Sequence, residues 1–209
     1  CRQTNLGYNL NQGMGTVRIT NGCVFINGLF FQSGYNAFVE KRNLTTGALV
    51  WRHEIIKGIR CFMDVDPQGN CYSGANIDSG SGKPFQFIIQ KLDANKNLIW
   101  QKMWIPNNFS QTENAMSGIS VSSKEDIVVI GGTHRVTTST KYAGYIFGRS
   151  MINGDSVFSL SLQNNPNVSV DITDVAFDTS GCFTVIGKER TPRTLFVRKY
   201  QQDSLVGIT

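Results

Sequence analysis

The chain has 209 residues, 40% of them hydrophobic, with 21 glycines and only 5 prolines. This is long enough to bury the core of one domain, and the composition is neither disordered nor fibrous. The formal net charge is +5, but lysines and arginines never stand three in a row, which argues against a nucleic-acid partner. The apolar runs are too short to span a bilayer, so no transmembrane helix is expected.

The first segment, residues 1–13, is polar and begins with Cys1 in place of a methionine. Bacterial lipoproteins begin with cysteine after signal cleavage, and a diacylglyceryl group on its sulfur anchors them. On that interpretation Cys1 is a lipidation candidate, residues 1–13 are a tether, and the lipid is the one expected link to a membrane. The alternatives are that residue 1 is where a fragment starts, or that residues 1–13 supply a closing strand.

From residue 14 onward one pattern recurs four times. A cation follows an apolar strand at intervals of 50, 58 and 50 residues: Lys41, Lys91, Arg149, Lys199. The first residue of another apolar strand recurs at intervals of 48, 56 and 55 residues: Cys23, Cys71, Ile127, Cys182. Two markers with one period predict four repeats of similar structure. Their approximate bounds are 14–55, 56–104, 115–162 and 168–209.

Each repeat is predicted to contain four short strands, a to d. Strand a alternates apolar and polar residues, as in "GTVRI" and "CFMDV", and a tight turn such as "TNGC" leads into strand b. Strand c ends at the cation, and a polar turn leads into strand d. No window shows a helical period. The sequence therefore predicts an all-β protein, a β-propeller of four four-stranded antiparallel blades, either a complete small propeller or part of a larger ring.

The second repeat, "DPQGNCYSGANIDSGSGKPFQFIIQKLDANKNLIWQKMW", resembles the SBBP-type β-propeller repeat of bacterial cell-surface and secreted proteins. The first and fourth repeats share strands b and c with that pattern, and the third shares its hydrophobic frame. The resemblance implies a propeller in an extracytoplasmic setting, secreted or associated with the outer membrane or cell surface. It implies no single function, because the family has none.

The loops predict where recognition occurs. In an antiparallel blade the a–b and c–d turns emerge at one end and the b–c and d–a loops at the other. Here the second set is long and irregular, and variable loops on a rigid scaffold are where binding concentrates. That end also carries His134, "KERTPRT" between strands b and c, and exposed aromatic residues. The candidate partner-binding residues are Tyr35, Lys83, Phe109, Arg135, Lys141, Tyr142, Lys188, Arg190 and Arg193.

Candidate chemical sites are few. In "DVDPQGN", Asp64 and Asp66 have the alternation of a Ca²⁺ loop, but the other repeats lack a second carboxylate there, which favours a hairpin turn. Cys23, Cys71 and Cys182 at one blade position are interpreted as small hydrophobic residues. No metal or cofactor is predicted, and no catalytic motif such as HExxH, GxSxG or a P-loop occurs.

The sequence thus predicts a non-catalytic, extracytoplasmic module that binds a protein partner through the b–c/d–a end, in a bacterial surface or outer-membrane-associated assembly. The alternative is a carbohydrate-binding propeller lectin or a glycan-active propeller enzyme. Such an enzyme could assemble carboxylates at its central mouth from separate blades, without any local motif.

Overall fold

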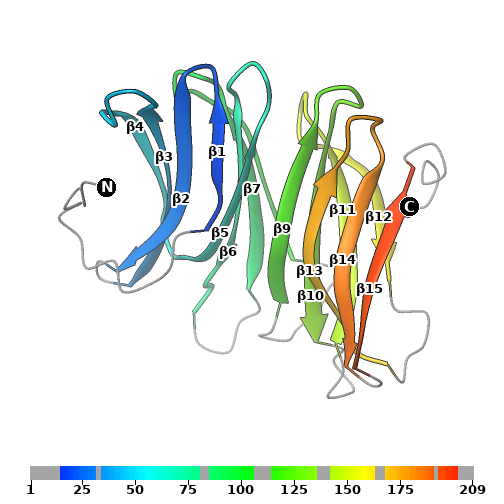
Figure 1. Cartoon of the computed structure of the whole chain (residues 1–209). Helices are drawn as coiled ribbons and strands as arrows, with labels where there is room; N and C mark the ends of the chain where they lie inside the picture. Colours follow the sequence, from blue (N-terminus) through cyan, green and yellow to red (C-terminus); the bar gives the residue numbers. More distant parts are fainter. Residues whose placement is uncertain are drawn as a thin grey trace.

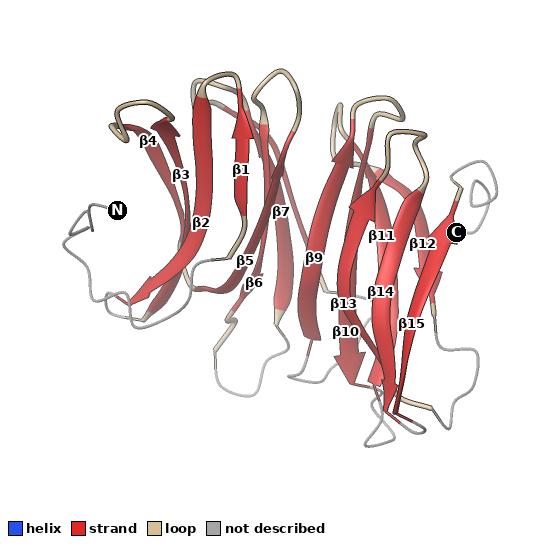
Figure 2. Cartoon of the chain, viewed as in Figure 1, coloured by secondary structure: helices blue, strands red, loops and turns tan. Residues whose placement is uncertain are grey.

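The computed structural model describes residues 15–31, 34–80, 85–105, 114–135, 142–162, 168–190 and 193–201. These residues form strands and turns (Figures 1 and 2). The strands are β1 (Val17–Thr20), β2 (Cys23–Phe31), β3 (Tyr35–Asn43), β4 (Leu49–Ile55), β5 (Gly58–Val65), β6 (Cys71–Ile77), β7 (Gln86–Leu92), β8 (Leu98–Trp104), β9 (Asn114–Ser122), β10 (Ile127–Arg135), β11 (Tyr142–Ser150), β12 (Ser156–Ser161), β13 (Val170–Phe177), β14 (Phe183–Arg190) and β15 (Arg193–Tyr200). Within the described ranges, no helix has the length and apolar character needed to cross a membrane.

The strands form four antiparallel sheets, each a meander of consecutive strands. The first three sheets, or blades, have four strands, β1–β4, β5–β8 and β9–β12. The fourth contains β13–β15, and its predicted strand d lies outside the described residues. The predicted all-β propeller architecture is confirmed. Figure 1 shows the blades side by side in chain order, with the a–b and c–d turns at the top.

Apolar cores lie between successive blades. We call the side of a blade that faces the next blade its forward face, and the other its back face. One core joins blades 1 and 2, a second joins blades 2 and 3, and a third joins blades 3 and 4. Within the described residues no core cluster joins blade 4 to blade 1. Since a lone sheet can cover neither face, each blade depends on its neighbours for burial.

In each of the first two blades, the recurring lysine and tryptophan both bind the same turn of the next blade. Lys41 and Trp51 are opposite each other in the β3–β4 ladder. Lys41 Nζ and Trp51 Nε1 both donate to the Ala94 carbonyl oxygen in the c–d turn of blade 2, at 3.0 and 3.1 Å. Each donor thus reaches across the interface to a backbone acceptor, and the lysine ammonium is not simply directed to solvent.

Blade 2 repeats this contact on blade 3. Lys91 Nζ and Trp100 Nε1 both donate to the Met151 carbonyl oxygen, at 3.0 Å each. The Lys91 ammonium also lies 5.3 Å from the centre of the Tyr72 ring, within the range of a cation–π interaction. We call this pair of donors on one turn carbonyl the Lys–Trp contact. It gives the structural reason why lysine and tryptophan recur in the sequences of these two blades.

In the third blade, the position that corresponds to Lys41 and Lys91 is Gly148, one residue before the predicted Arg149. Phe158, opposite Gly148, takes the place of the tryptophan, and its ring lies against Gly148, where a side chain would collide with it. Arg149 therefore does not correspond to Lys41 and Lys91. It is on the back face, with its guanidinium 4.3 Å from the ring centre of Trp104 in blade 2.

The predicted equivalence of the cysteines is also wrong for Cys71. Phe25 is opposite Lys41 and Tyr72 is opposite Lys91, so Cys71 is one position further along strand b than Cys23. The a–b turns differ in length. Aligning the cysteines by residue identity aligned the ends of these turns, and it placed Cys71 on the wrong face of its strand. Cys71 is fully buried. Burial raises its pKa, and raises the pKa of Cys61 to about 12, so neither thiol is a nucleophile at neutral pH.

The Lys–Trp contact predicts non-additive stability. Lys91→Met or Trp100→Phe alone should lower the free energy of unfolding by about 1 kcal/mol, because the other donor remains on the Met151 carbonyl. The double variant should lose more than the sum, because the carbonyl then has neither donor. Urea titrations of the four proteins of this cycle measure the coupling. Lys96→Met, at an exposed turn position, is the control and should change stability little; strict additivity would contradict the contact's proposed role.

Candidate binding site at the mouth of the blades

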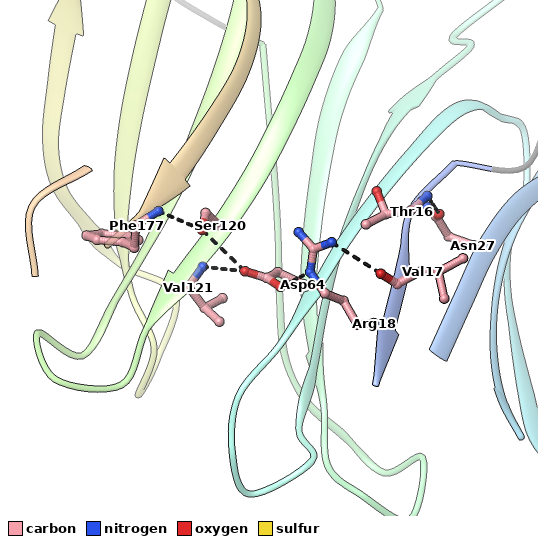
Figure 3. Close-up of polar contacts among 8 residues, drawn as sticks. All are labelled: Thr16, Val17, Arg18, Asn27, Asp64, Ser120, Val121 and Phe177. Carbon is pink, nitrogen blue, oxygen red and sulfur yellow. Dashed lines mark hydrogen bonds and ion pairs between the residues drawn. The ribbon is translucent and has the colours of Figure 1, made fainter. Parts of the chain in front are cut away.

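A chain of hydrogen bonds joins the innermost strands of all four blades (Figure 3). Arg18 Nε on β1 lies 2.6 Å from Asp64 Oδ1 on β5. Asp64 Oδ2 accepts from the Val121 amide at 3.0 Å and from Ser120 Oγ at 3.3 Å, both on β9. Ser120 Oγ in turn accepts from the Phe177 amide of β13 at 3.1 Å. The Ca²⁺ interpretation of Asp64 therefore gives way to a structural role between blades.

Asp66 has the predicted turn role. Its carboxylate accepts hydrogen bonds from the Asn70 amide and side chain, at 2.9 and 2.8 Å, and from the Tyr72 hydroxyl at 3.2 Å. Across the described ranges, no group of three or more His, Cys, Asp or Glu could hold a metal ion.

A second set of buried polar side chains joins strand b of each blade to strand a of the next. Asn27 Nδ2 donates to the Cys61 carbonyl at 2.6 Å. Asn76 Oδ1 accepts from the Met116 amide at 3.0 Å, and Thr133 Oγ1 accepts from the Ile172 amide at 3.0 Å. These bonds satisfy backbone groups of strand a and hold β5, β9 and β13 in fixed positions.

Where these strands begin, at the b–c/d–a end, blades 2, 3 and 4 enclose a cavity of about 600 Å³. This volume is in the range of small-molecule sites. Strands β5, β9 and β13 supply its inner wall, and β6, β10, β11 and β14 contribute from further out. The lining residues are Ile59, Arg60, Phe62, Asn76, Phe85, Ala115, Ser117, Thr133, Tyr142, Asp171, Ile172, Thr173, Lys188 and Arg190.

The charges of the lining are unbalanced. The lining has three cations, Arg60, Lys188 and Arg190, and one carboxylate, Asp171. Arg190 donates to both oxygens of Asp171, at 2.7 and 3.2 Å, and Lys188 Nζ is 3.9 Å from the same carboxylate. The hydrogen bond from Arg190 to Asp171 raises the pKa of Arg190. Since one carboxylate is shared by two of the cations, the cavity favours an anionic ligand group.

Arg190 also has an aromatic partner. Its guanidinium carbon lies 4.1 Å from the ring centre of Tyr142, which belongs to the neighbouring blade. This cation–π contact and the paired bonds to Asp171 fix the orientation of the guanidinium. The wall between blades 3 and 4 is therefore pre-organised before any ligand arrives.

The structure brings together three of the predicted partner-binding residues, Tyr142, Lys188 and Arg190. Arg193 is beside them, opposite Arg190 in the β14–β15 ladder. Tyr35, which is 43% exposed, lines a separate cavity of about 590 Å³ between blades 1 and 2. Lys83, Phe109, Lys141 and Cys1 lie outside the described residues, as does the side chain of Arg135.

Two predictions about this end of the molecule need correction. Lys188, Arg190 and Arg193 were expected in a loop, but β14 continues to Arg190 and β15 starts at Arg193. Charged residues are compatible with a strand when one of its faces is open to solvent. His134 was expected on the loop surface, but it is buried, with its ring 4.3 Å from that of Tyr145.

Sequence reasoning missed Arg60 and Asp171. Each stands near the start of a strand a, where the ladder is irregular, between Gly58 and Arg60 and between Ile172 and Asp174. Such bulges redirect side chains, so simple alternation assigns the wrong face. Their position in the repeat was the signal that could have identified them. The starts of all strands a converge in a propeller, whatever residues stand there.

Burial of His134 predicts an acid-sensitive contribution to stability. Burial lowers the pKa of His134 from 6.5 to about 4. The unfolded chain therefore binds the proton first, and the contribution present above pH 6.5 is lost as the pH falls toward about 4. His134→Gln should remove about 3 kcal/mol of this pH dependence. Urea midpoints of both proteins over this pH window measure the difference; parallel curves would show that His134 does not contribute.

No protein-family model matches the chain, and no curated protein matches it significantly. Among solved structures, the quinohemoprotein alcohol dehydrogenase ADHIIG from Pseudomonas putida HK5 is similar to it at 14% identity, with a TM-score of 0.64 over 97% of this chain and 34% of that one. The chain thus spans about a third of the length of that structure. The β-propeller domain of the Trilobed protease from Pyrococcus furiosus matches at 10% identity, with a TM-score of 0.27 over 92% of this chain and 81% of that domain. At 14% identity, the similarity to the alcohol dehydrogenase bears on the fold alone.

Proposed function

We propose that this chain is a non-catalytic, extracytoplasmic interaction module that binds an acidic segment of a protein partner at its b–c/d–a end. The cavity between blades 2, 3 and 4 receives an acidic side chain of that partner, and the surrounding loops contact the rest. The observation that carries the proposal is the unbalanced charge of this cavity, with Arg60, Lys188 and Arg190 against Asp171.

The cavity chemistry favours binding over catalysis. Asp171 is the one carboxylate among the described lining residues, and Arg190 holds both of its oxygens. A general base needs a free lone pair aimed at the substrate, and both oxygens of Asp171 already accept hydrogen bonds from Arg190. Arg60, in contrast, is exposed and can form a bidentate contact with an incoming carboxylate. The extracytoplasmic setting rests on the resemblance to the SBBP-type repeat and on the interpretation of Cys1.

A carbohydrate ligand is the second candidate. Tyr142 and Phe85 place aromatic surface in the cavity wall, and Asn76, Ser117 and Thr173 add polar side chains. Aromatic rings can pack against the apolar face of a sugar, and the polar side chains can hydrogen-bond its hydroxyl groups. On this alternative the cations select acidic sugars.

The charge proposal is tested with a matched pair of double variants. Arg60→Glu with Lys188→Glu reverses the charge of the lining, and Lys96→Glu with Lys124→Glu makes the same change in net charge at the turns of the opposite end. Calorimetric titration with a poly-glutamate peptide should show at least a tenfold weaker affinity for the first variant and little change for the second, because only the first acts in the cavity.

The outcomes separate the candidates. Equal weakening in both variants would mean that the peptide responds to net charge alone, and unchanged binding in both would contradict the cavity as the site. A glycan array probed with the wild-type protein tests the second candidate. Strong sugar binding that the cavity variant abolishes, without peptide binding, would favour the lectin over the protein-binding module.

A further inference from the structure

The forward face of blade 4 exposes apolar side chains in a row. Leu195 is 80% exposed and Val197 70%, on β15, and Ile186, opposite Val197 on β14, is 43% exposed. The corresponding faces of blades 1, 2 and 3 are covered by the next blade. In blade 1, Val39 precedes its lysine by two residues, as Val197 precedes Lys199, and Val39 is fully buried.

Lys199 occupies the position of the lysine in the Lys–Trp contact. It is opposite Thr184 in the β14–β15 ladder, as Lys41 is opposite Phe25. Lys41 and Lys91 each donate to a turn carbonyl of the following blade. Lys199, which is 59% exposed, instead pairs with Asp178 in a turn of its own blade at 2.7 Å. Blade 4 therefore carries the donor of the repeating interface on its uncovered face.

The back face of blade 1 is the matching half. Val17 is 48% exposed and Ile19 63%, both on β1. In blade 2, Met63 has the position of Val17, and it is fully buried against blade 1.

Further out on the back face of blade 1, Phe30 and Phe38 are already buried, with the Arg52 guanidinium 4.7 and 4.2 Å from their ring centres. Glu40 is buried too, and it pairs with Arg42 and Arg52 at 2.8 and 3.4 Å. Strand β1 is therefore the part of the back face that is open to a second copy.

The c–d turn of blade 1 also offers the matching acceptor. The acceptor carbonyls in blades 2 and 3 belong to Ala94 and Met151. Leu44 holds the corresponding turn position in blade 1: its amide donates to the Gly22 carbonyl at 2.9 Å, as the Met151 amide donates to the Asp126 carbonyl at 2.8 Å. One chain thus contains both halves of the lysine–carbonyl contact that it already uses twice, between blades 1 and 2 and between blades 2 and 3.

We propose that the forward face of blade 4 docks on the back face of blade 1 of a second copy of this chain. Leu195, Val197 and Ile186 of one copy cover Val17 and Ile19 of the other, and Lys199 exchanges Asp178 for the Leu44 carbonyl. The contact is head-to-tail, so it continues the blade-to-blade packing across two chains. The occupant is a second copy because the forward face of blade 4 and the back face of blade 1 have the same residue positions that meet where successive blades pack together.

Three double variants test this proposal by light scattering after gel filtration, over a range of protein concentrations. Leu195→Asp with Val197→Asp removes the forward surface, and Val17→Asp with Ile19→Asp removes the back surface. Ile152→Asp with Ile56→Asp changes two exposed apolar residues (71% and 64% exposed) that belong to neither face. Wild type and the control should form assemblies of at least two copies, and each surface variant alone should associate at least tenfold more weakly.

Mixing the two surface variants is the decisive measurement. Each retains the half that the other lacks, so the mixture should form a two-copy complex and nothing larger. A wild-type protein that stays monomeric throughout the concentration range would overturn the proposal. It would also be overturned if the back-surface variant assembled like wild type, since blade 4 would then pair with itself. Circular dichroism spectra that match wild type verify that the variants are folded.

Discussion

Burial of apolar surface between successive sheets is the constraint on which this structure depends. A four-stranded sheet satisfies most of its own backbone hydrogen bonds, but it leaves two faces that need cover. The chain meets this need by placing like sheets against one another, so that Phe25, Val39 and Trp51 of blade 1 pack against Met63 and Cys71 of blade 2. Stability is then close to a sum over neighbouring pairs of blades. Blades 2 and 3 pack against a neighbouring blade on both sides, and within the described residues blades 1 and 4 pack against a neighbouring blade on one side.

Directional contacts fix how the sheets stack. Apolar burial alone would allow neighbouring blades to slide, whereas the Lys–Trp contact sets the outer edge and the hydrogen-bond chain through Asp64 and Ser120 sets the inner one. The Lys–Trp contact uses backbone carbonyls as acceptors, and the inner chain combines the Val121 and Phe177 amides with side-chain pairs of Asp64. The fixed starts of β5, β9 and β13 then allow Arg60 of blade 2 to share one cavity with Asp171 and Arg190 of blade 4.

Much of the fold was predictable from sequence because alternation and turns are local signals. The pairs Val17 and Ile19, and Met63 and Val65, share a face as predicted, and the Asn21–Gly22 turn has the positive φ values, 49° and 69°, that its residues favour. Arg149 and Cys71 were misplaced by one position because turn length and bulges shift the register without changing residue types. The partner of Lys41 was beyond prediction, since the Ala94 carbonyl lies 53 residues away on another sheet. The cavity was found only in part. Asp171 meets Arg190 through the pairing of β13 with β14, and Arg60 of blade 2 joins this pair in one cavity only through the stacking of blades.

Hydrogen–deuterium exchange of the backbone amides, at a concentration where the chain is monomeric, tests the central claim most directly. If pairwise burial between blades sustains the fold, amides of the central strands of blades 2 and 3 should exchange most slowly, and those of blades 1 and 4 faster. Equal protection in all four blades, or slowest exchange in blade 4, would contradict the account, because stability would then not follow the number of neighbours that cover each blade.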